Sequence, residues 1–263
     1  MEPSAIKPKQ LVLTMLGANP DGRLTVNRLI EAGRLFGIEP AALRVSLGRL
    51  VKQGLLVSPT RGTYEAAAQV HALNKRLRSW RTVEDALTDW TGAWLIAHVS
   101  HLGRADKTQL ARRERALRLF GFREDVSGVW IRPANLVDPL QKTAARLQDI
   151  GLEAEGLLIS ATDVSGPDDF NPARLWDRAK IEAGYQDLIG AMDDVSRHAK
   201  DTAIEDLARK TLLLGDQVIK HINLDPLLPK ELVDTRLRRK LIERRIKFDE
   251  LGMKTWVDFP PRR

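Results

Sequence analysis

The sequence predicts a mixed α+β protein that is mostly helical, with an N-terminal helical module, a central module of alternating strands and helices, and a C-terminal helical part. Apolar residues recur at three- and four-residue spacing over most of the chain, short apolar runs interrupt this pattern in the centre, and turn-forming clusters separate the segments. We place the boundaries at 1–68, 69–89 (a connecting helix), 90–165 and 166–263.

The N-terminal module is organised around a predicted helix that begins at Pro40 and ends before Gly54. Proline suits the first helical position, and glycine suits the residue that follows a helix. We expect its apolar face to be Leu43, Leu47, Leu50 and Val51. The opposite side carries Arg44, Ser46, Arg49, Lys52 and Gln53, which is typical of a helix in a DNA major groove, although an ordinary solvated basic face has the same composition.

The neighbouring segments favour DNA binding. A short helix (9–16), a strand (23–25) and a second helix (26–36) precede Pro40, and Thr25 is the expected N-cap of the second helix. Two strands, 55–58 and 63–67, follow around a basic turn. This order is that of a winged helix-turn-helix. The candidate DNA contacts are Thr25, Arg44, Ser46, Arg49, Lys52 and Arg61.

The centre and the C-terminal part have different patterns. A helix is expected over 70–87, and after it strands at 94–99, 129–131 and 155–161 alternate with helices at 106–121 and 138–150, which suggests a ferredoxin-like domain. Further helices are predicted at 175–198, 204–214, 218–222 and 232–251. The basic run 236–247 has an apolar stripe of Leu237, Leu241, Ile242 and Ile246, so we interpret it as a packed amphipathic helix with a basic outer face.

The composition narrows the functional classes. The chain has 263 residues, no cysteine, and a formal net charge of +7, with the positive charge concentrated in the first half. The absence of cysteine excludes disulfides, thiolate metal sites and a cysteine nucleophile. No apolar run approaches the roughly 20 residues that span a bilayer, and the N-terminus lacks a leader's apolar stretch, so we expect a cytoplasmic protein without a membrane partner.

No catalytic signature stands out. The chain contains no phosphate-binding glycine loop, no GxSxG and no HExxH, so we expect neither an enzyme nor a cofactor. His98 and His101 lie at the end of the first central strand, but without a third ligand they indicate a hydrogen-bonded loop pair and no metal site. Trp80, Trp94 and Trp130 are expected in the core.

Four segments resemble the PaaX-type transcriptional regulators, the repressor family of phenylacetic acid catabolism and related aromatic pathways. They are LRVSLGRLVKQGLL (43–56), the central run from Trp94 through RRERALRLFGF (112–122) to GVWIRP (128–133), LWDRAKIEAGYQDL (175–188) and LDPLLPKELV (224–233). They occur in the family's order over nearly the whole chain.

The resemblance implies a winged helix, a central domain similar to the small CRISPR-associated endoribonuclease fold, and a C-terminal helical domain. It also implies a homodimeric repressor that leaves its double-stranded DNA operator when an aryl-CoA thioester binds. Cations suit the phosphates of such a thioester, and apolar walls suit its acyl end. An aromatic acid is the alternative effector. The candidate effector-binding residues are Arg112, Arg118, Trp130, Arg132, Trp176 and Arg178.

The chain departs from the family and from the nuclease at two places. Its wing, Ser58–Ala67, is shorter than the family's usual wing with paired basic residues. The nuclease has an Asp at the end of its first strand, whereas here that region reads His98-Val99-Ser100-His101. The alternatives to a ligand-responsive repressor are a nuclease that uses the central domain and a non-catalytic nucleic-acid-binding partner of a larger complex.

Overall fold

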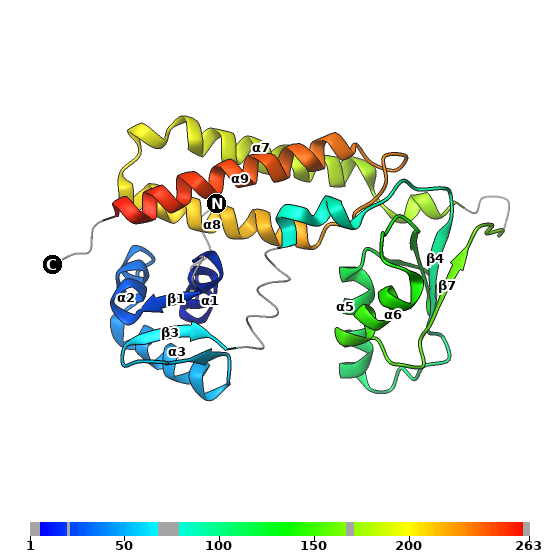
Figure 1. Ribbon diagram of the computed structural model, residues 1–263, viewed down its shortest axis with the longest axis horizontal. Helices are drawn as coiled ribbons and strands as arrows, with labels where there is room; N and C mark the ends of the chain where they lie inside the picture. Colours follow the sequence, from blue (N-terminus) through cyan, green and yellow to red (C-terminus); the bar gives the residue numbers. More distant parts are fainter. Residues whose placement is uncertain (1–5, 20–21, 68–78, 167–170, 260–263) are drawn as a thin grey trace. The chain divides into compact units, whose positions relative to one another are not determined.

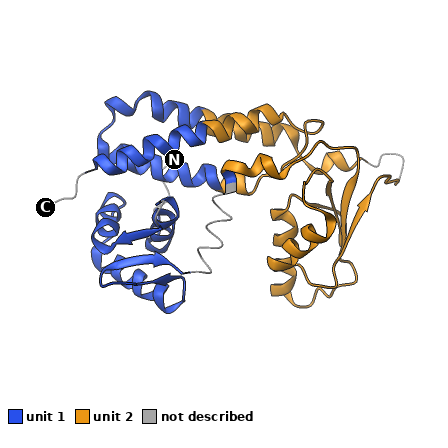
Figure 2. Ribbon diagram, viewed as in Figure 1, with its two compact units in different colours: residues 1–80, 190–219, 244–263 blue, residues 81–189, 220–243 orange. Residues whose placement is uncertain are grey.

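A computed structural model describes residues 6–19, 22–67, 79–166 and 171–259 (Figure 1). The chain divides into two compact units, one of residues 1–80, 190–219 and 244–263 and the other of residues 81–189 and 220–243 (Figure 2). The described residues are mostly helical, with two antiparallel sheets. The predicted α+β class is therefore confirmed, while the boundaries proposed from the sequence remain a prediction.

The N-terminal part of unit 1 contains three helices and a three-stranded antiparallel sheet in the order β1-β3-β2. Thr25 ends β1 and caps α2, since its side chain accepts a hydrogen bond from the backbone N–H of Arg28 at 3.3 Å. The elements are close to those expected from the sequence: α1 (Pro8–Ala18), β1 (Arg23–Thr25), α2 (Val26–Leu35), α3 (Pro40–Lys52), β2 (Leu56–Val57) and β3 (Thr63–Ala66).

The beginning and the end of α3 follow from its sequence. Pro40 occupies the first turn, and Gly54 takes a φ of 67° just after the helix. The N–H of Leu55 donates to the carbonyl of Leu50 at 3.0 Å and that of Gly54 to Val51 at 2.9 Å, which is the Schellman pattern. Leu43, Leu47 and Leu50 are buried as expected, but Val51 is 38% exposed, so its place on the apolar face was wrong.

Residues from the end of the chain complete the core of this part. Leu212 of α8 (Ile204–Asn223) is buried in the same cluster as Leu43 and Leu47, and Trp256 of α9 (Thr235–Asp258) packs against that cluster. Arg28 of α2 donates to the backbone carbonyls of Trp256 and Phe259, with its guanidinium 5.5 Å from the Trp256 ring centroid. The N-terminal residues thus do not bury their apolar surface alone.

Unit 2 contains a four-stranded antiparallel sheet in the order β5-β6-β4-β7. Helices α5 and α6 cover one face of it, over a core that includes Leu117, Trp130 and Leu147 (Figure 1). One strand, β5, was missed because its charged sequence REDV lies at the edge and is half exposed. The bounds are β4 (Trp94–His98), α5 (Lys107–Leu119), β5 (Arg123–Val126), β6 (Val129–Pro133), α6 (Leu140–Asp149) and β7 (Leu157–Ala161).

A second apolar cluster in unit 2 centres on Ile131 of β6. Trp176, Leu228 and Val233 are buried with it, and Trp94 packs against the cluster with its ring stacked on Trp176 at a centroid separation of 6.3 Å. Trp176, Leu228 and Val233 follow the central sheet in the chain, so the sheet shares this cluster with later segments. The remaining elements are η1 (Ser79–Ala86), η2 (Pro172–Leu175), α7 (Arg178–Arg197) and η3 (Ala199–Asp201).

The helical segments differ from expectation in three places. Half of the helix expected over 70–87, residues 70–78, lies outside the described residues, and the other half is mostly the 3₁₀ segment η1, with a non-helical Thr82. The two helices expected over 204–222 are one, α8, because Gly215 does not interrupt it. On α9, Arg238 and Arg245 are buried and Ile246 is 37% exposed, so the expected basic outer face is only partly correct.

The helices α7, α8 and α9 each contribute residues to both units. Residues 166–263, expected from the sequence to form one helical part, therefore belong partly to unit 1 and partly to unit 2. Among the described residues, no helix combines the length and apolar character needed to cross a membrane.

Gly121 offers a test of the packing in unit 2. Its φ is +78°, and a Cβ there would lie 2.4 Å from the carbonyl oxygen of Pro226. We expect Gly121→Ala to lower the free energy of unfolding by at least about 2 kcal/mol, because the left-handed conformation alone costs about 1–2 kcal/mol and the backbone contact adds to it. Urea unfolding followed by tryptophan fluorescence measures the change. Gly103→Ala is the control, since its Cβ would meet nothing within 4 Å, and equal stability of the two variants would contradict the prediction.

Candidate functional site

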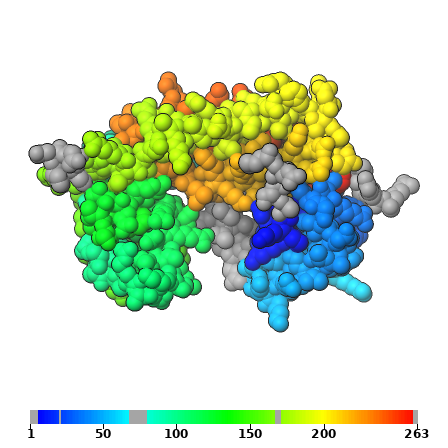
Figure 3. All heavy atoms as spheres, turned by 180° about the vertical axis from the view of Figure 1, so that it is seen from behind, coloured from blue at the N-terminus to red at the C-terminus, as the bar shows by residue number. Residues whose placement is uncertain are grey.

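The exposed side of α3 carries three of the predicted DNA contacts. Arg44, Arg49 and Lys52 are all exposed, whereas Leu43, Leu47 and Leu50 fix the opposite side in the core. Successive residues of a helix are about 100° apart around its axis. A line along the helix through Val45 therefore has Arg44 on one side and Arg49 on the other, and it passes close to Lys52 near the end of the helix. In Figure 3, long side chains of the light-blue region, which includes α3, stand out from the surface of unit 1.

The other predicted DNA contacts are placed differently. Ser46 is half-buried on the side of α3 that turns toward the core, so it is not grouped with Arg44 and Arg49. The Thr25 hydroxyl is used as the N-cap of α2. Arg61 is exposed at the turn between β2 and β3, where Gly62 has a φ of +79°. The exposed candidates therefore lie in two places. Arg44, Arg49 and Lys52 are on the α3 face, and Arg61 is at the β2–β3 turn.

Val45 was missed by the sequence analysis. It is 54% exposed, in the centre of the α3 face between the cations. Gly48 lies one turn further on, and a Cβ added there would meet nothing within 4 Å. The signal was present in the helical periodicity, since position 45 falls opposite Leu43, Leu47 and Leu50.

The structure divides the six candidate effector residues into an exposed and a buried group. The exposed residues are Arg112 and Arg118 of α5 and Arg178 of α7. Arg118 pairs with Glu114 at 3.1 Å, and its guanidinium lies 5.5 Å from the centroid of the Trp130 ring. Arg178 pairs with Glu182 at 2.8 Å. The exposed side of α5 also carries Lys107 and Arg115, so the helix presents a strongly basic surface.

The buried group consists of Trp130, Arg132 and Trp176. Arg132 donates to the carbonyls of Pro133 (3.1 Å) and Phe120 and to the side-chain oxygen of Asn135 at 2.9 Å. Burial lowers the pKa of this guanidinium. Its partners are all within the protein, and Trp176 packs in the Ile131 cluster. Arg112, Arg118 and Arg178 are the candidates that a ligand reaches from solvent.

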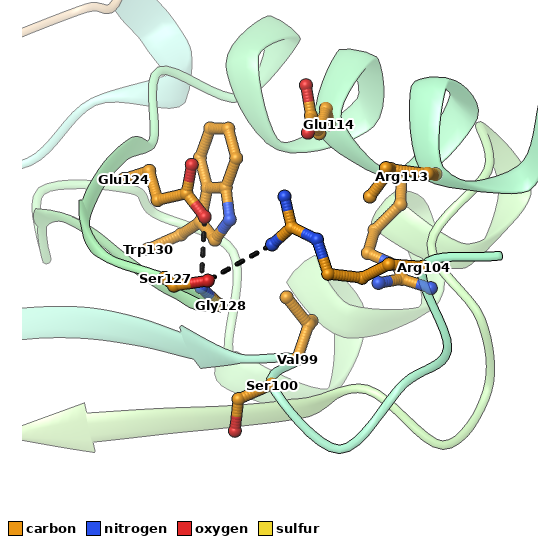
Figure 4. A pocket seen from close by; sticks show the side chains of 10 residues that line it. Val99, Ser100, Arg104, Arg113, Glu114, Glu124, Ser127, Gly128 and Trp130 are labelled. Atoms are coloured by element: carbon orange, nitrogen blue, oxygen red, sulfur yellow. Dashed lines mark hydrogen bonds between the residues drawn. The ribbon is translucent and has the colours of Figure 1, made fainter. Parts of the chain in front are cut away.

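A small hollow lies between the end of β4, the helix α5 and the β5–β6 turn (Figure 4). Its cavity volume is only about 40 Å³, and Trp130 forms part of its wall. Arg104 points into it and donates to the hydroxyl of Ser127 at 3.1 Å, and Glu124 accepts from the N–H of Gly128 at 2.9 Å. The hollow therefore combines an aromatic surface with charges of both signs.

Arg113 anchors α5 beside this hollow. It is 3% exposed, and its guanidinium donates to the carboxylate of Glu153 and to the carbonyl of Gly103 at 3.1 Å. The hydrogen bond from Arg113 is the main reason why the pKa of Glu153 is lowered. A buried guanidinium with a carboxylate partner fixes the position of the basic helix relative to the sheet.

The histidines at the end of β4 are each hydrogen bonded, but not to one another. The Nε2 atom of His98 lies 2.6 Å from the Ser100 hydroxyl, and that of His101 lies 2.9 Å from the carbonyl oxygen of Glu155. Their ring centroids are 5.4 Å apart. Among the residues that the structure describes, no group of three or more His, Cys, Asp or Glu side chains is placed to hold a metal ion.

A buried polar cluster in unit 2 was not anticipated. Asp225 accepts hydrogen bonds from the Tyr185 hydroxyl and from the N–H of Leu227 at 2.7 Å, and it lies 3.8 Å from the guanidinium of Arg238. Arg238 also donates to Glu84 at 2.6 Å. Burial raises the pKa of Asp225, while the charge of Arg238 acts against that rise. These residues are distant in sequence, so their pairing leaves no local signal.

Comparison with solved structures finds a similar fold in the uncharacterized protein Rv0674 from Mycobacterium tuberculosis. The TM-score is 0.62 at 25% sequence identity, and the match covers 96% of this chain and 99% of that chain. No protein-family model matches the sequence, and no curated protein matches it. The similarity therefore extends over nearly the whole chain but attaches no function to it.

The Arg113–Glu153 pair predicts a pH-dependent stability. We expect Glu153→Gln to lower the free energy of unfolding at pH 7 by about 3 kcal/mol, because it leaves a buried guanidinium without its carboxylate. Since the folded-state pKa of Glu153 is lowered, the contribution of this carboxylate is present above the unfolded-state value of about 4.3 and is lost as the pH falls through the folded-state value.

Urea unfolding at pH 7 and at a series of lower pH values measures both effects. The variant is expected to lack the part of the acid-induced destabilisation that Glu153 supplies in the wild type. Glu155→Gln, which changes an exposed carboxylate two residues away, is the control. A stability of Glu153→Gln equal to that control at pH 7 would show that the pair does not stabilise the fold.

Proposed function

We propose that the protein is a sequence-specific, double-stranded-DNA-binding transcriptional repressor and not an enzyme. The observation that carries this proposal is the α3 face, where Arg44, Arg49 and Lys52 are exposed together while the other side of the same helix is held in the core. A short helix fixed in this way suits the width of the major groove, and arginine is the commonest reader of guanine there.

The order of the elements supports two finer assignments. Three helices with a three-stranded sheet, in which Arg61 lies at the β2–β3 turn, match a winged helix-turn-helix with a short wing. The chain order β4-α5-β5-β6-α6-β7 and the sheet order β5-β6-β4-β7 match the split βαβ arrangement of a ferredoxin-like domain. Both assignments agree with the resemblance to the PaaX-type regulators, which we propose as the family.

The family resemblance also favours a cytoplasmic homodimer. A single winged helix contacts only a short half-site, and two half-sites together supply the affinity and specificity of an operator. We therefore propose that two copies of the chain bind one operator.

We further propose that a small-molecule effector, an acyl- or aryl-CoA thioester or an aromatic acid, releases the protein from DNA. A ligand shifts such an equilibrium only if it binds the two states with different affinity. Arg112 and Arg118 on α5 are the cations best placed for the phosphates, because both are exposed. The Trp130 ring, beside which Arg118 lies, lines the adjoining hollow but is only 2% exposed, so the proposal rests on the two cations.

The DNA proposal predicts different effects for two residues on α3. With an operator selected from a random DNA library, we expect Arg49→Ala to cost about 1–3 kcal/mol and to relax the preference at one base position. Lys52→Ala is expected to weaken all sequences alike and to reduce the slope of log K against log salt by about one unit, as for a phosphate contact. Mobility shifts over a range of salt concentrations measure both changes.

Lys200→Ala is the control, since it removes an exposed cation in η3. The same titrations give the stoichiometry, which we expect to be two chains per operator. Binding of both α3 variants with wild-type affinity would remove this helix from the interface. Metal-dependent cleavage of the probe without a stable shift would favour a nuclease instead.

The effector proposal predicts that DNA binding and release are separable. Arg118→Ala is expected to keep operator affinity but to weaken release by a CoA thioester at least about tenfold, as the loss of one charge-assisted phosphate contact implies. Arg197→Ala, which removes an exposed arginine of α7, is the control. Calorimetry on the wild type decides the ligand class: no heat with CoA thioesters but binding of an aromatic acid would keep the effector and discard the CoA form.

A further inference from the structure

Val45 occupies an unusual position for an exposed apolar residue. It is 54% exposed in the centre of the α3 face, with Arg44 on one side, Arg49 on the other and Lys52 beyond it. A single exposed valine on a protein surface needs no explanation. Here, however, it lies in the middle of a cationic helix face whose other side is fixed by three buried leucines, so the face is held rigidly around it.

The side chains in the centre of this face are short, and those on either side of it are long. Position 41 is alanine and position 48 is glycine, both exposed and in line with Val45, and a Cβ on Gly48 would meet nothing within 4 Å. The arginine side chains on both sides are much longer. A helix of this shape places its own backbone and the Val45 isopropyl group close to the floor of a groove, while the guanidinium groups extend toward its walls.

The floor of the DNA major groove offers a limited set of partners. Guanine, cytosine and adenine present hydrogen-bond donors and acceptors there, and thymine adds a C5-methyl group, which is the apolar group of the natural base edges. Val45 has no polar side-chain atom, so its isopropyl group matches the thymine methyl. The positive charges around it complement the phosphates and the guanine acceptors that flank such a base.

We propose that Val45 is a specificity-determining residue that recognises the 5-methyl group of a thymine in the operator, between contacts made by Arg44 and Arg49. This inference rests on the proposed function, because it assigns a base to the centre of the helix proposed to bind DNA. It predicts an operator half-site in which the base opposite the middle of α3 is thymine and the flanking positions include guanine.

The test removes the methyl group without changing the base pairing. Each thymine of the selected operator is replaced in turn by deoxyuridine, and the dissociation constant is measured for the wild type and for Val45→Ala. We expect one thymine per half-site at which the wild type loses about fourfold in affinity, the equivalent of one buried methyl group at about 0.8 kcal/mol. Val45→Ala is expected to bind the thymine and uracil forms equally at that position.

Two further variants make the result specific. Val45→Thr keeps the branched shape but replaces one methyl group by a hydroxyl, and it is expected to keep only part of the thymine preference. Val126→Ala removes an equally exposed valine, 58% exposed on β5, and is expected to leave that preference unchanged. Circular dichroism of each variant shows that the fold is retained.

The outcomes separate this inference from the proposed function. Failure to select any preferred DNA sequence would overturn the proposed function. Sequence-specific binding in which the same thymine-to-uracil penalties are found for the wild type and for Val45→Ala would overturn the role of Val45 alone. A penalty lost only in Val45→Ala, and not in Val126→Ala, would support it.

Discussion

The buried carboxylate of Asp225 is the constraint on which the packing of unit 2 depends. Its two oxygens accept from the Tyr185 hydroxyl and the Leu227 N–H, and the charge of Arg238 lies 3.8 Å away. An unpaired buried carboxylate would cost several kcal/mol. The loop between α8 and α9, which carries Asp225, must therefore meet Tyr185 of α7 and Arg238 of α9 in one arrangement. Leu227 is held at a φ of 53°, and the side-chain amide of Asn135 donates to its carbonyl at 2.8 Å. The strained residue is thus fixed from both sides.

This arrangement explains what the most specific sequence motifs do. The LDPLLP segment places Pro226 against Gly121 of the RRERALRLFGF segment, and Asn135 connects Leu227 to Arg132 of GVWIRP. The hydrogen bond from Tyr185 to Asp225 connects the segment 175–188 to the same loop. The last three segments of the resemblance thus contain residues that hold unit 2 together. The groups proposed to meet DNA or an effector lie within two of the same segments, on the exposed faces of α3 and α5.

Local patterns predicted the local structure well. The end signals of α3, three of its four expected apolar positions and the N-cap at Thr25 were identified from a few adjacent residues, and so was the strand expected at 94–99, which is Trp94–His98 in the structure. Features that depend on distant partners were not. Arg238 and Arg245 look like surface cations in sequence, but both are buried and pair with the half-buried carboxylates of Glu84 and Asp249. The edge strand β5 carries too much charge to be recognised, and the exposure of Val45 becomes meaningful only when the neighbouring cations are seen on the same face.

The shared core of unit 1 has a consequence for the order of events during synthesis. Arg28 is hydrogen bonded to Trp256, 228 residues later in the chain, and Leu212 belongs to the same apolar cluster as Leu43 and Leu47. At about 5–20 residues per second, a ribosome needs roughly 10–45 s to supply the second partner after the first. During that interval the nascent N-terminal segment leaves part of its apolar surface uncovered. The segment proposed to bind DNA thus reaches its final packing only after Trp256 and Phe259 have been synthesised, so products that end before α9 lack this packing.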